Sequence, residues 1–156
     1  MTASTGGCQC GAVRFRIEGE LGEASICHCR MCQKATGGLF GPYVGAPFDR
    51  VAWTRGEPSY FQSSNKVRRG FCCNCGTPLT FEYEEGHVSF ALGAMDTPPV
   101  GQLSEQLASP DRIADFEVLA RLPEHPTDEP QAAAHLAAIV SFQHPDYDTT
   151  DWPSND

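Results

Sequence analysis

Hydrophobic and polar positions alternate in short runs along the first two thirds of the chain. Residues 12–17 alternate apolar and charged side chains with the period of two that is typical of a half-buried strand. Most such runs are brief and bounded by Gly, Pro, Asn or Asp, which favour turns. Strands are therefore expected at residues 12–17, 24–27, 40–44, 51–54, 59–62, 67–71, 79–82 and 88–92. The pattern predicts a mainly β fold of short antiparallel strands with little helix.

Helix is expected in only a few places. Residues 29–36 predict one helical turn, which Gly37 and Gly38 end because glycine readily leaves the helical conformation. Residues 104–108 predict a second turn, and residues 131–142 have helical character. Residues 116–122 mix apolar and charged side chains and could close the domain.

The chain length suits a single domain followed by an extension. With 156 residues, 40% of them hydrophobic, the chain can bury one core. We place the domain at residues 1–122. Residues 123–156 contain several prolines and no Lys or Arg, so we expect an acidic extension that is partly helical or loosely ordered.

The charge is unevenly distributed along the sequence. The net charge is −9, but residues 1–69 carry +4 and residues 70–156 carry −13. Such acidity argues against a nucleic-acid partner, because phosphate binding needs a basic face. The basic half could attract a small anionic substrate, or the folded chain could simply mix the two halves. Without an apolar run of about 20 residues or a signal-like start, we expect no membrane partner and a cytoplasmic protein.

All eight cysteines lie in three clusters in the first half of the chain. Reducing compartments disfavour disulfides, and clustered spacing then favours metal binding. Cysteines that only pack a core would scatter along strands instead. The clusters are Cys8 and Cys10, then Cys27, Cys29 and Cys32, then Cys72, Cys73 and Cys75.

The first and third clusters together predict a closed zinc site. Structural zinc takes four tetrahedral ligands, and an early pair with a late pair would join distant strands. Cys8 and Cys10 form the early pair. Cys72 and Cys75 form the late pair in our interpretation, because their C-x-x-C spacing before a glycine resembles a zinc knuckle. Pairing Cys73 with Cys75 would also be chemically sound.

The middle cluster predicts a site of another kind. Cys27, Cys29 and Cys32 supply three sulfurs within six residues, one short of a closed tetrahedron. A zinc ion with three protein ligands and one open position is the arrangement of catalytic sites. The open position could take a substrate thiol, which the metal would convert to the nucleophilic thiolate.

The alternative is that a fourth side chain closes the middle cluster as well. His28 lies between two of the cysteines, so its ring should point away from the metal. Cys73 and His87 are the more plausible fourth ligands, if folding brings one of them close.

Three motifs in order resemble the glutathione-dependent formaldehyde-activating (GFA) family, which includes CENP-V-type domains. They are GGCQCGAV, CHCRMCQKATGG and FCCNCGTPL, and the resemblance spans residues 6–122. It implies a β-tent type zinc-binding fold. It also implies a structural zinc on Cys8, Cys10, Cys72 and Cys75, and a second, catalytic zinc on Cys27, Cys29 and Cys32. The activity it implies is that of a carbon–sulfur lyase, which condenses formaldehyde with glutathione to S-(hydroxymethyl)glutathione or reverses that step.

Glutathione carries two carboxylates, so cations near the middle cluster would help to orient it. Lys34 lies closest in sequence and Arg30 next, while Lys66, Arg68 and Arg69 are more distant. Backbone donors in the turn Thr36-Gly37-Gly38 are further candidates for substrate contact. His28 has the best position among the histidines for acid–base work, and Asp96 could face the site or simply occupy a turn.

Two rival functions remain at the level of sequence. The chain could be a non-catalytic zinc module that binds a protein partner. It could also be an enzyme of the same type acting on a different thiol adduct or an imine-like compound. The sequence does not identify the substrate or the oligomeric state.

Overall fold

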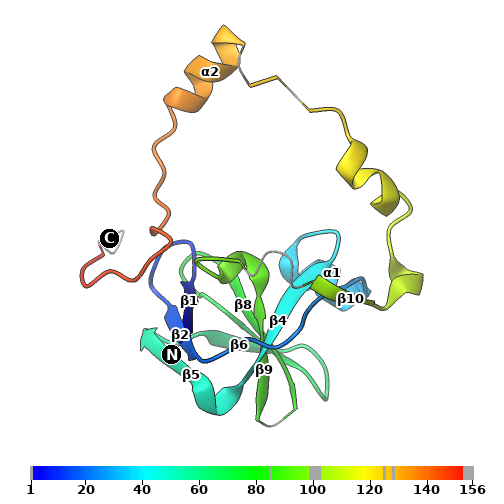
Figure 1. The fold of residues 1–156 in the computed structure, drawn as a ribbon, viewed down its shortest axis with the longest axis vertical. Coiled ribbons are helices and arrows are strands. Elements are labelled where there is room, and N and C mark those ends of the chain that lie inside the picture. Colours follow the sequence, from blue (N-terminus) through cyan, green and yellow to red (C-terminus); the bar gives the residue numbers. More distant parts are fainter. Residues whose placement is uncertain (1, 85, 99–102, 125, 128, 153–156) are drawn as a thin grey trace. The chain divides into compact units, whose positions relative to one another are not determined.

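The computed structural model describes residues 2–84, 86–98, 103–124, 126–127 and 129–152, and strands dominate this part of the chain (Figure 1). The prediction of a mainly β fold with short antiparallel strands is therefore confirmed. A three-stranded sheet has the order β1-β2-β5. Its members are β1 (Ala3–Gly7), β2 (Arg14–Glu18) and β5 (Val51–Arg55).

A second sheet of seven strands has the order β10-β3-β4-β9-β8-β7-β6. All its neighbours pair antiparallel except β10 and β3, which are parallel. Its members are β3 (Ala24–Cys27), β4 (Gly41–Pro47), β6 (Ser59–Gln62), β7 (Arg68–Phe71), β8 (Pro78–Glu84), β9 (His87–Ala91) and β10 (Leu103–Leu107).

The core contains the inward-facing residues of both sheets. In β2, Phe15 and Ile17 are fully buried, whereas Arg16 between them is exposed, as the period of two predicts. The Phe15 ring lies 4.4 Å from the ring of Phe90 in β9, centroid to centroid. Each such phenylalanine contributes about 1.5–3 kcal/mol of burial free energy. The aromatic contact therefore joins the two sheets.

Two strands were not expected from the sequence. Residues 104–108 were predicted as a helical turn, but β10 forms there and pairs with β3. That prediction was wrong because all five β10 side chains are exposed, so no hydrophobic alternation marks the strand. The strand β1 was missed for a similar reason, since its sequence ASTGG has little apolar character.

Helix is confined to short elements. Helix α1 (Arg30–Thr36) ends at Gly37, which has the left-handed φ of 68° that glycine adopts without strain. Short 3₁₀ helices lie at Phe48–Arg50, Leu92–Ala94, Ser109–Asp111 and Phe116–Arg121. No helix in the described ranges is long and apolar enough to cross a membrane.

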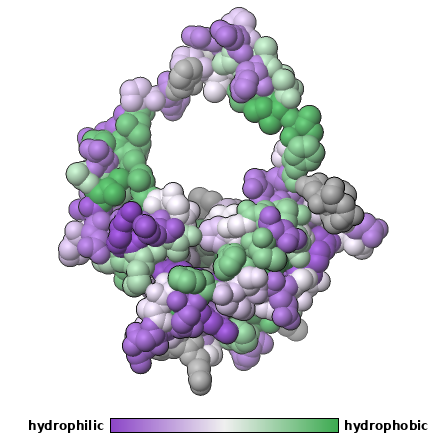
Figure 2. All heavy atoms as spheres, turned by 180° about the vertical axis from the view of Figure 1, so that it is seen from behind, coloured by the Kyte–Doolittle hydropathy of each residue, from purple (hydrophilic) through white to green (hydrophobic). Residues whose placement is uncertain are grey.

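Residues 113–142 form a compact unit of their own. It contains the 3₁₀ turn Phe116–Arg121 and helix α2 (Pro130–Ala137), which lies within the segment expected to be helical. Apolar side chains are visible along this unit in Figure 2. The exposed ones are Val118, Leu122, Leu136, Ile139, Val140 and Phe142.

The segment that follows, residues 143–152, belongs to the same compact unit as residues 2–112. We call it the C-terminal strap. The His144 N–H donates to the carbonyl of Gln9 at 2.8 Å, and Trp152 Nε1 donates to the carbonyl of Cys10 at 2.9 Å. These bonds connect the strap to the loop between β1 and β2. The expectation that residues 123–156 are partly helical or loosely ordered stays a prediction. The domain boundary placed at Leu122 stays a prediction.

Candidate functional site

The first and third cysteine clusters meet in one place. Cys8 and Cys10 lie in the loop between β1 and β2, and Cys72 and Cys75 lie in the loop between β7 and β8. Their four sulfurs are all within 4.8 Å of one another. We call them the four-thiol cluster. The exposed Cys73 lies outside it, and its thiol donates to the side chain of Asn74.

Backbone hydrogen bonds hold the cluster in place. In the second loop, Cys72 N–H donates to the Thr77 carbonyl at 3.0 Å, and Gly76 N–H donates to the Cys72 carbonyl at 2.9 Å. In the first loop, Val13 N–H donates to Cys8 Sγ at 3.2 Å. These bonds turn each loop so that its two sulfurs face the other pair.

The sulfur separations fit zinc. Cys8 Sγ lies 3.6 Å from Cys10 Sγ, which lies 3.8 Å from Cys72 Sγ. Four sulfurs around zinc at about 2.3 Å are separated by about 3.8 Å in a tetrahedron. The four-thiol cluster therefore has the donor set and the spacing of a structural zinc site.

Protonation of these thiols depends on their position. Burial raises the pKa of Cys8 to about 12. Burial opposes ionisation of Cys75 too, but hydrogen bonds from the side chain and backbone of Thr77 outweigh it and lower the pKa of Cys75 to about 6. Because metals bind thiolates, loading the cluster must release protons from groups such as Cys8.

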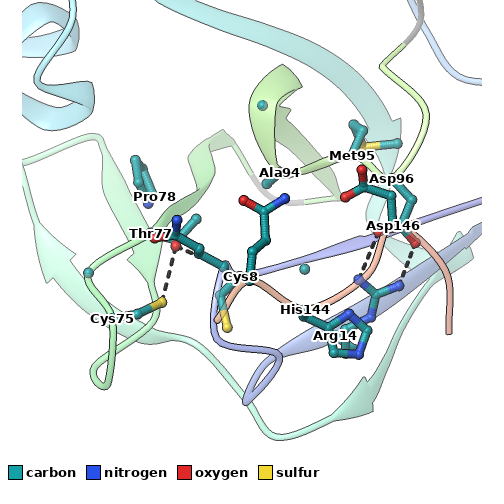
Figure 3. A pocket seen from close by; sticks show the side chains of 15 residues that line it. Cys8, Arg14, Cys75, Thr77, Pro78, Ala94, Met95, Asp96, His144 and Asp146 are labelled. Atoms are coloured by element: carbon teal, nitrogen blue, oxygen red, sulfur yellow. Dashed lines mark hydrogen bonds and ion pairs between the residues drawn. The ribbon is translucent and has the colours of Figure 1, made fainter. Parts of the chain in front are cut away.

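A cavity of about 380 Å³ lies beside the four-thiol cluster (Figure 3). On its wall Arg14 is paired with the carboxylate of Asp96, which also accepts a hydrogen bond from Thr5 at 2.6 Å. Burial disfavours the Asp96 carboxylate, but the bonds from Arg14 and Thr5 outweigh it and lower its pKa. Asp96 thus belongs to a buried ion pair next to this cluster.

The middle cysteines form a three-thiol cluster. Cys27 ends β3, Cys29 is the N-cap of α1, and Cys32 lies inside that helix. The helical turn brings the Cys32 N–H to 3.4 Å from Cys29 Sγ, and all three sulfurs lie within 4.8 Å of one another. Cys32 is buried, whereas Cys27 and Cys29 are partly exposed, so the cluster is open to solvent on their side.

Among the described residues, no fourth Cys, His, Asp or Glu ligand atom joins this cluster. His28 is fully buried, and its Nε2 pairs with the Gln106 side chain of β10 at 3.0 Å, so its ring points away as expected. Neither Cys73 nor His87 is among the grouped ligands. The geometry therefore gives no support to the closed alternative.

Two buried polar groups that sequence reasoning did not rank highly lie against the three-thiol cluster. Arg69, treated as a distant cation, donates from Nη2 to Cys32 Sγ at 3.4 Å and from Nη1 to the Tyr43 hydroxyl at 3.0 Å. Burial raises the pKa of Tyr43 to about 12, so its hydroxyl stays protonated at neutral pH. Strand alternation in β7 could have identified Arg69, because it places Arg69 on the face opposite the exposed Arg68.

The other candidate contacts lie at the end of α1. Lys34 is exposed in the last turn of the helix. The Thr36 hydroxyl donates to the carbonyls of Cys32 and Phe40, and the Gly38 N–H donates to that hydroxyl. These bonds, with Gly37 at the C-cap, end the helix one turn after Cys32. A role of Lys34 or of this turn in substrate contact stays a prediction.

Comparison with known proteins agrees with this arrangement. Residues 3–111 match the model of the family described as "Glutathione-dependent formaldehyde-activating enzyme". An uncharacterized lyase of Schizosaccharomyces pombe is 30% identical over 97 residues, which cover 57% of this chain and 64% of that protein. The chain thus spans less than two thirds of that relative's length. The crystal structure of a Rhodobacter sphaeroides protein, 20% identical, has the same fold with a TM-score of 0.53, over 65% of this chain and 98% of the other.

Proposed function

The chain belongs to the family of glutathione-dependent formaldehyde-activating enzymes, and from this premise we propose that it is a zinc-dependent carbon–sulfur lyase. Its substrates are a small thiol such as glutathione and a small aldehyde. The reaction forms or cleaves an adduct such as S-(hydroxymethyl)glutathione.

The observation that carries this proposal is the three-thiol cluster. Its sulfurs converge from one short segment, and among the described residues no fourth side-chain ligand joins them. Structural zinc sites normally have four protein ligands, whereas catalytic sites keep one position for substrate. The four-thiol cluster of the same chain gives the internal comparison, because it has all four ligands that a closed site needs.

We assign one zinc ion to each cluster. Cys8, Cys10, Cys72 and Cys75 hold the structural ion, and Cys27, Cys29 and Cys32 hold the catalytic ion. Zinc with three thiolate ligands supplies a Lewis acid that favours the thiolate form of a bound thiol.

The reaction itself is an addition. The substrate sulfur attacks the aldehyde carbon, the C–S bond forms as the C=O π bond breaks, and the thiol proton ends on the new hydroxyl. The chain's contribution is to orient the reactants and to hold charge near the sulfur. Cys27 and Cys29 leave the cluster accessible on one side, while Tyr43 and Arg69 bury the side next to Cys32.

The test is turnover of formaldehyde plus glutathione by the wild type and by the Cys29→Ser variant. We expect a rate above the spontaneous condensation for the wild type. The variant should stay folded, lose one of the two zinc ions and lose turnover by at least about a hundredfold, as catalytic metal sites do when a ligand is removed.

Cys73→Ser is the matched control, because Cys73 is exposed and outside both clusters. It should keep both zinc ions and full activity. A wild type with no rate above the spontaneous one would show that formaldehyde is the wrong electrophile. Two zinc ions that are equally inert to chelators and unaffected by glutathione would instead indicate a non-catalytic binding module.

A further inference from the structure

Arg69 is a buried cation with no carboxylate partner. Its relative exposure is 7%, and among the described residues no Asp or Glu oxygen lies within ion-pair distance of it. Its guanidinium instead donates to Cys32 Sγ, to the hydroxyl of Tyr43 and to the hydroxyl of Ser63. The central carbon of its guanidinium, Cζ, also lies 4.9 Å from the centre of the Phe81 ring.

Burying such a charge is costly unless an opposite charge compensates for it. The other well-buried arginine illustrates the usual solution, because Arg14 pairs with Asp96 and Asp148. Around Arg69 the neighbours able to carry negative charge are the Cys32 sulfur and the Tyr43 hydroxyl. Metals bind cysteine as the thiolate, so in the metal-loaded cluster the Cys32 sulfur, which accepts from Arg69, is the negative group beside the guanidinium.

We infer that Arg69 is a positioning residue that supplies the counter-charge of the three-thiol cluster and makes the site prefer an anionic incoming ligand. Three thiolates with one divalent ion carry one net negative charge, which the guanidinium balances. An incoming thiolate adds a second negative charge that Arg69 also attracts, whereas a neutral ligand adds none. This inference rests on the proposed function, in which the incoming ligand is a thiol.

The contacts of Arg69 also fix its direction. Three side chains from different parts of the fold accept from its three nitrogens, at 3.1 Å for Ser63, 3.0 Å for Tyr43 and 3.4 Å for Cys32. A planar guanidinium can satisfy all three at once, whereas a lysine ammonium is a single point of charge. Lysine at this position should therefore keep the charge but lose part of the orientation.

The experiment compares Arg69→Met and Arg69→Lys with an Arg68→Met control. Arg68 directly precedes Arg69 in β7, and it pairs with the buried Glu82 rather than with the cluster. Its loss leaves the buried Glu82 carboxylate without its cation, with the bond from Thr80 remaining, so this variant controls for a general loss of stability. Zinc-loaded proteins are titrated calorimetrically with glutathione, with 2-mercaptoethanol, which has no carboxylate, and with imidazole, which binds zinc as the neutral molecule. The zinc affinity of each cluster is measured separately by competition with a chelator.

We expect Arg69→Met to weaken the binding of both thiols at least about thirtyfold, the low end for truncating one partner of a buried charge pair. Imidazole binding should change less than about twofold. The zinc affinity of the three-thiol cluster should also fall at least about thirtyfold, while that of the four-thiol cluster is unchanged. Arg69→Lys should recover most of the lost thiol binding and zinc affinity. Arg68→Met should bind both thiols and zinc as the wild type does.

Unchanged thiol binding and zinc affinity in Arg69→Met would overturn the inference. An equal loss for thiols and imidazole would also overturn it, because that indicates a general collapse of the cluster. If glutathione binds more weakly while 2-mercaptoethanol binds as before, the inference is also overturned, because Arg69 then binds a substrate carboxylate. If the wild type binds neither thiol, the proposed function fails, and the zinc affinities still decide whether Arg69 is the counter-charge.

Discussion

At the scale of single residues, buried charge is confined to a few sites with defined partners. Arg14 and Asp96 form a nearly buried pair whose side chains are 4% and 7% exposed, and Thr5 completes the bonds to the carboxylate. The pair joins β2 to the segment after β9, next to the four-thiol cluster. Breaking such a pair leaves an uncompensated charge, which costs more than the pair itself contributes.

We predict that Asp96→Asn lowers the free energy of unfolding at pH 7 by about 3 kcal/mol. The pKa of Asp96 is lowered in the folded protein, so its carboxylate stabilises the fold above its unfolded pKa of about 3.9. That contribution is lost as the pH falls through the folded pKa. Urea unfolding of variant and wild type should therefore differ at pH 7 and converge as the pH falls below the unfolded pKa and through the lowered folded pKa of Asp96.

The matched control is Glu18→Gln, which removes an exposed pair with Arg16 on the same strand. It should leave stability nearly unchanged at either pH, because exposed pairs contribute little. A gap between Asp96→Asn and wild type that persists undiminished in acid would contradict the assigned role of the carboxylate.

Sequence reasoning at this scale succeeded where chemistry is local and failed where it depends on long-range contact. The clustering of the three middle cysteines could be predicted directly, because they lie within six residues and one helical turn brings Cys32 to Cys29. The roles of Tyr43 and Arg69 could not be predicted, because Arg69 bonds to Cys32 from 37 positions away and to Tyr43 from 26 positions away. No spacing rule encodes that distance.

At the scale of elements, the strands with one buried face were predictable and the polar ones were not. Strand β3 has the expected ends, and its buried Ala24 and Ile26 alternate with partly exposed residues. Strand β6 also has the expected ends, although most of its side chains are exposed. The edge strand β10 was missed because parallel pairing with β3, not local pattern, makes it a strand. The C-terminal strap was missed for the same reason, since its contacts are mostly polar bonds to the other end of the chain.

The strap covers the first loop of the four-thiol cluster. Gly11 in this loop has a φ of +74°, and a Cβ there would lie 2.4 Å from the His144 ring and 2.8 Å from the Trp152 ring. Only glycine therefore allows the strap to lie this close. Arg55 fixes the strap from the other side, by donating to the Thr149 carbonyl and to that of Gly11.

We predict that Trp152→Ala lowers the free energy of unfolding by about 2 kcal/mol, because it removes the bond to the Cys10 carbonyl and the contact with His144. Zinc in the four-thiol cluster should then be lost to a chelator several-fold faster. Tyr147→Ala is the control, since Tyr147 is an exposed aromatic residue of the same strap. Equal rates of zinc loss in both variants would contradict a protective strap.

At the scale of the whole molecule, the two clusters differ in what they connect. The four-thiol cluster joins the loop after β1 of the small sheet to the loop after β7 of the large sheet. The three-thiol cluster lies within one segment of six residues. The acidic strap also meets Arg14 and Arg55, so the two charge halves of the sequence mix in this part of the fold.

We predict that the four-thiol cluster determines the stability of the fold and that the three-thiol cluster contributes little to it. Cys10→Ser should lower the thermal midpoint by at least about 10 °C, because a metal that joins distant strands contributes directly to folding free energy. Cys29→Ser should change it by only a few degrees. Scanning calorimetry of both zinc-loaded variants checks this, and a larger loss for Cys29→Ser would reverse the assignment of the two clusters.

The most direct test of the central claim is the number of glutathione molecules bound, measured together with zinc content in the same samples. The wild type should carry one zinc ion per cluster and bind one glutathione, and Cys29→Ser should carry one zinc ion fewer and bind none. Full zinc content with undiminished glutathione binding in Cys29→Ser would contradict the claim that the three-thiol cluster receives the thiol.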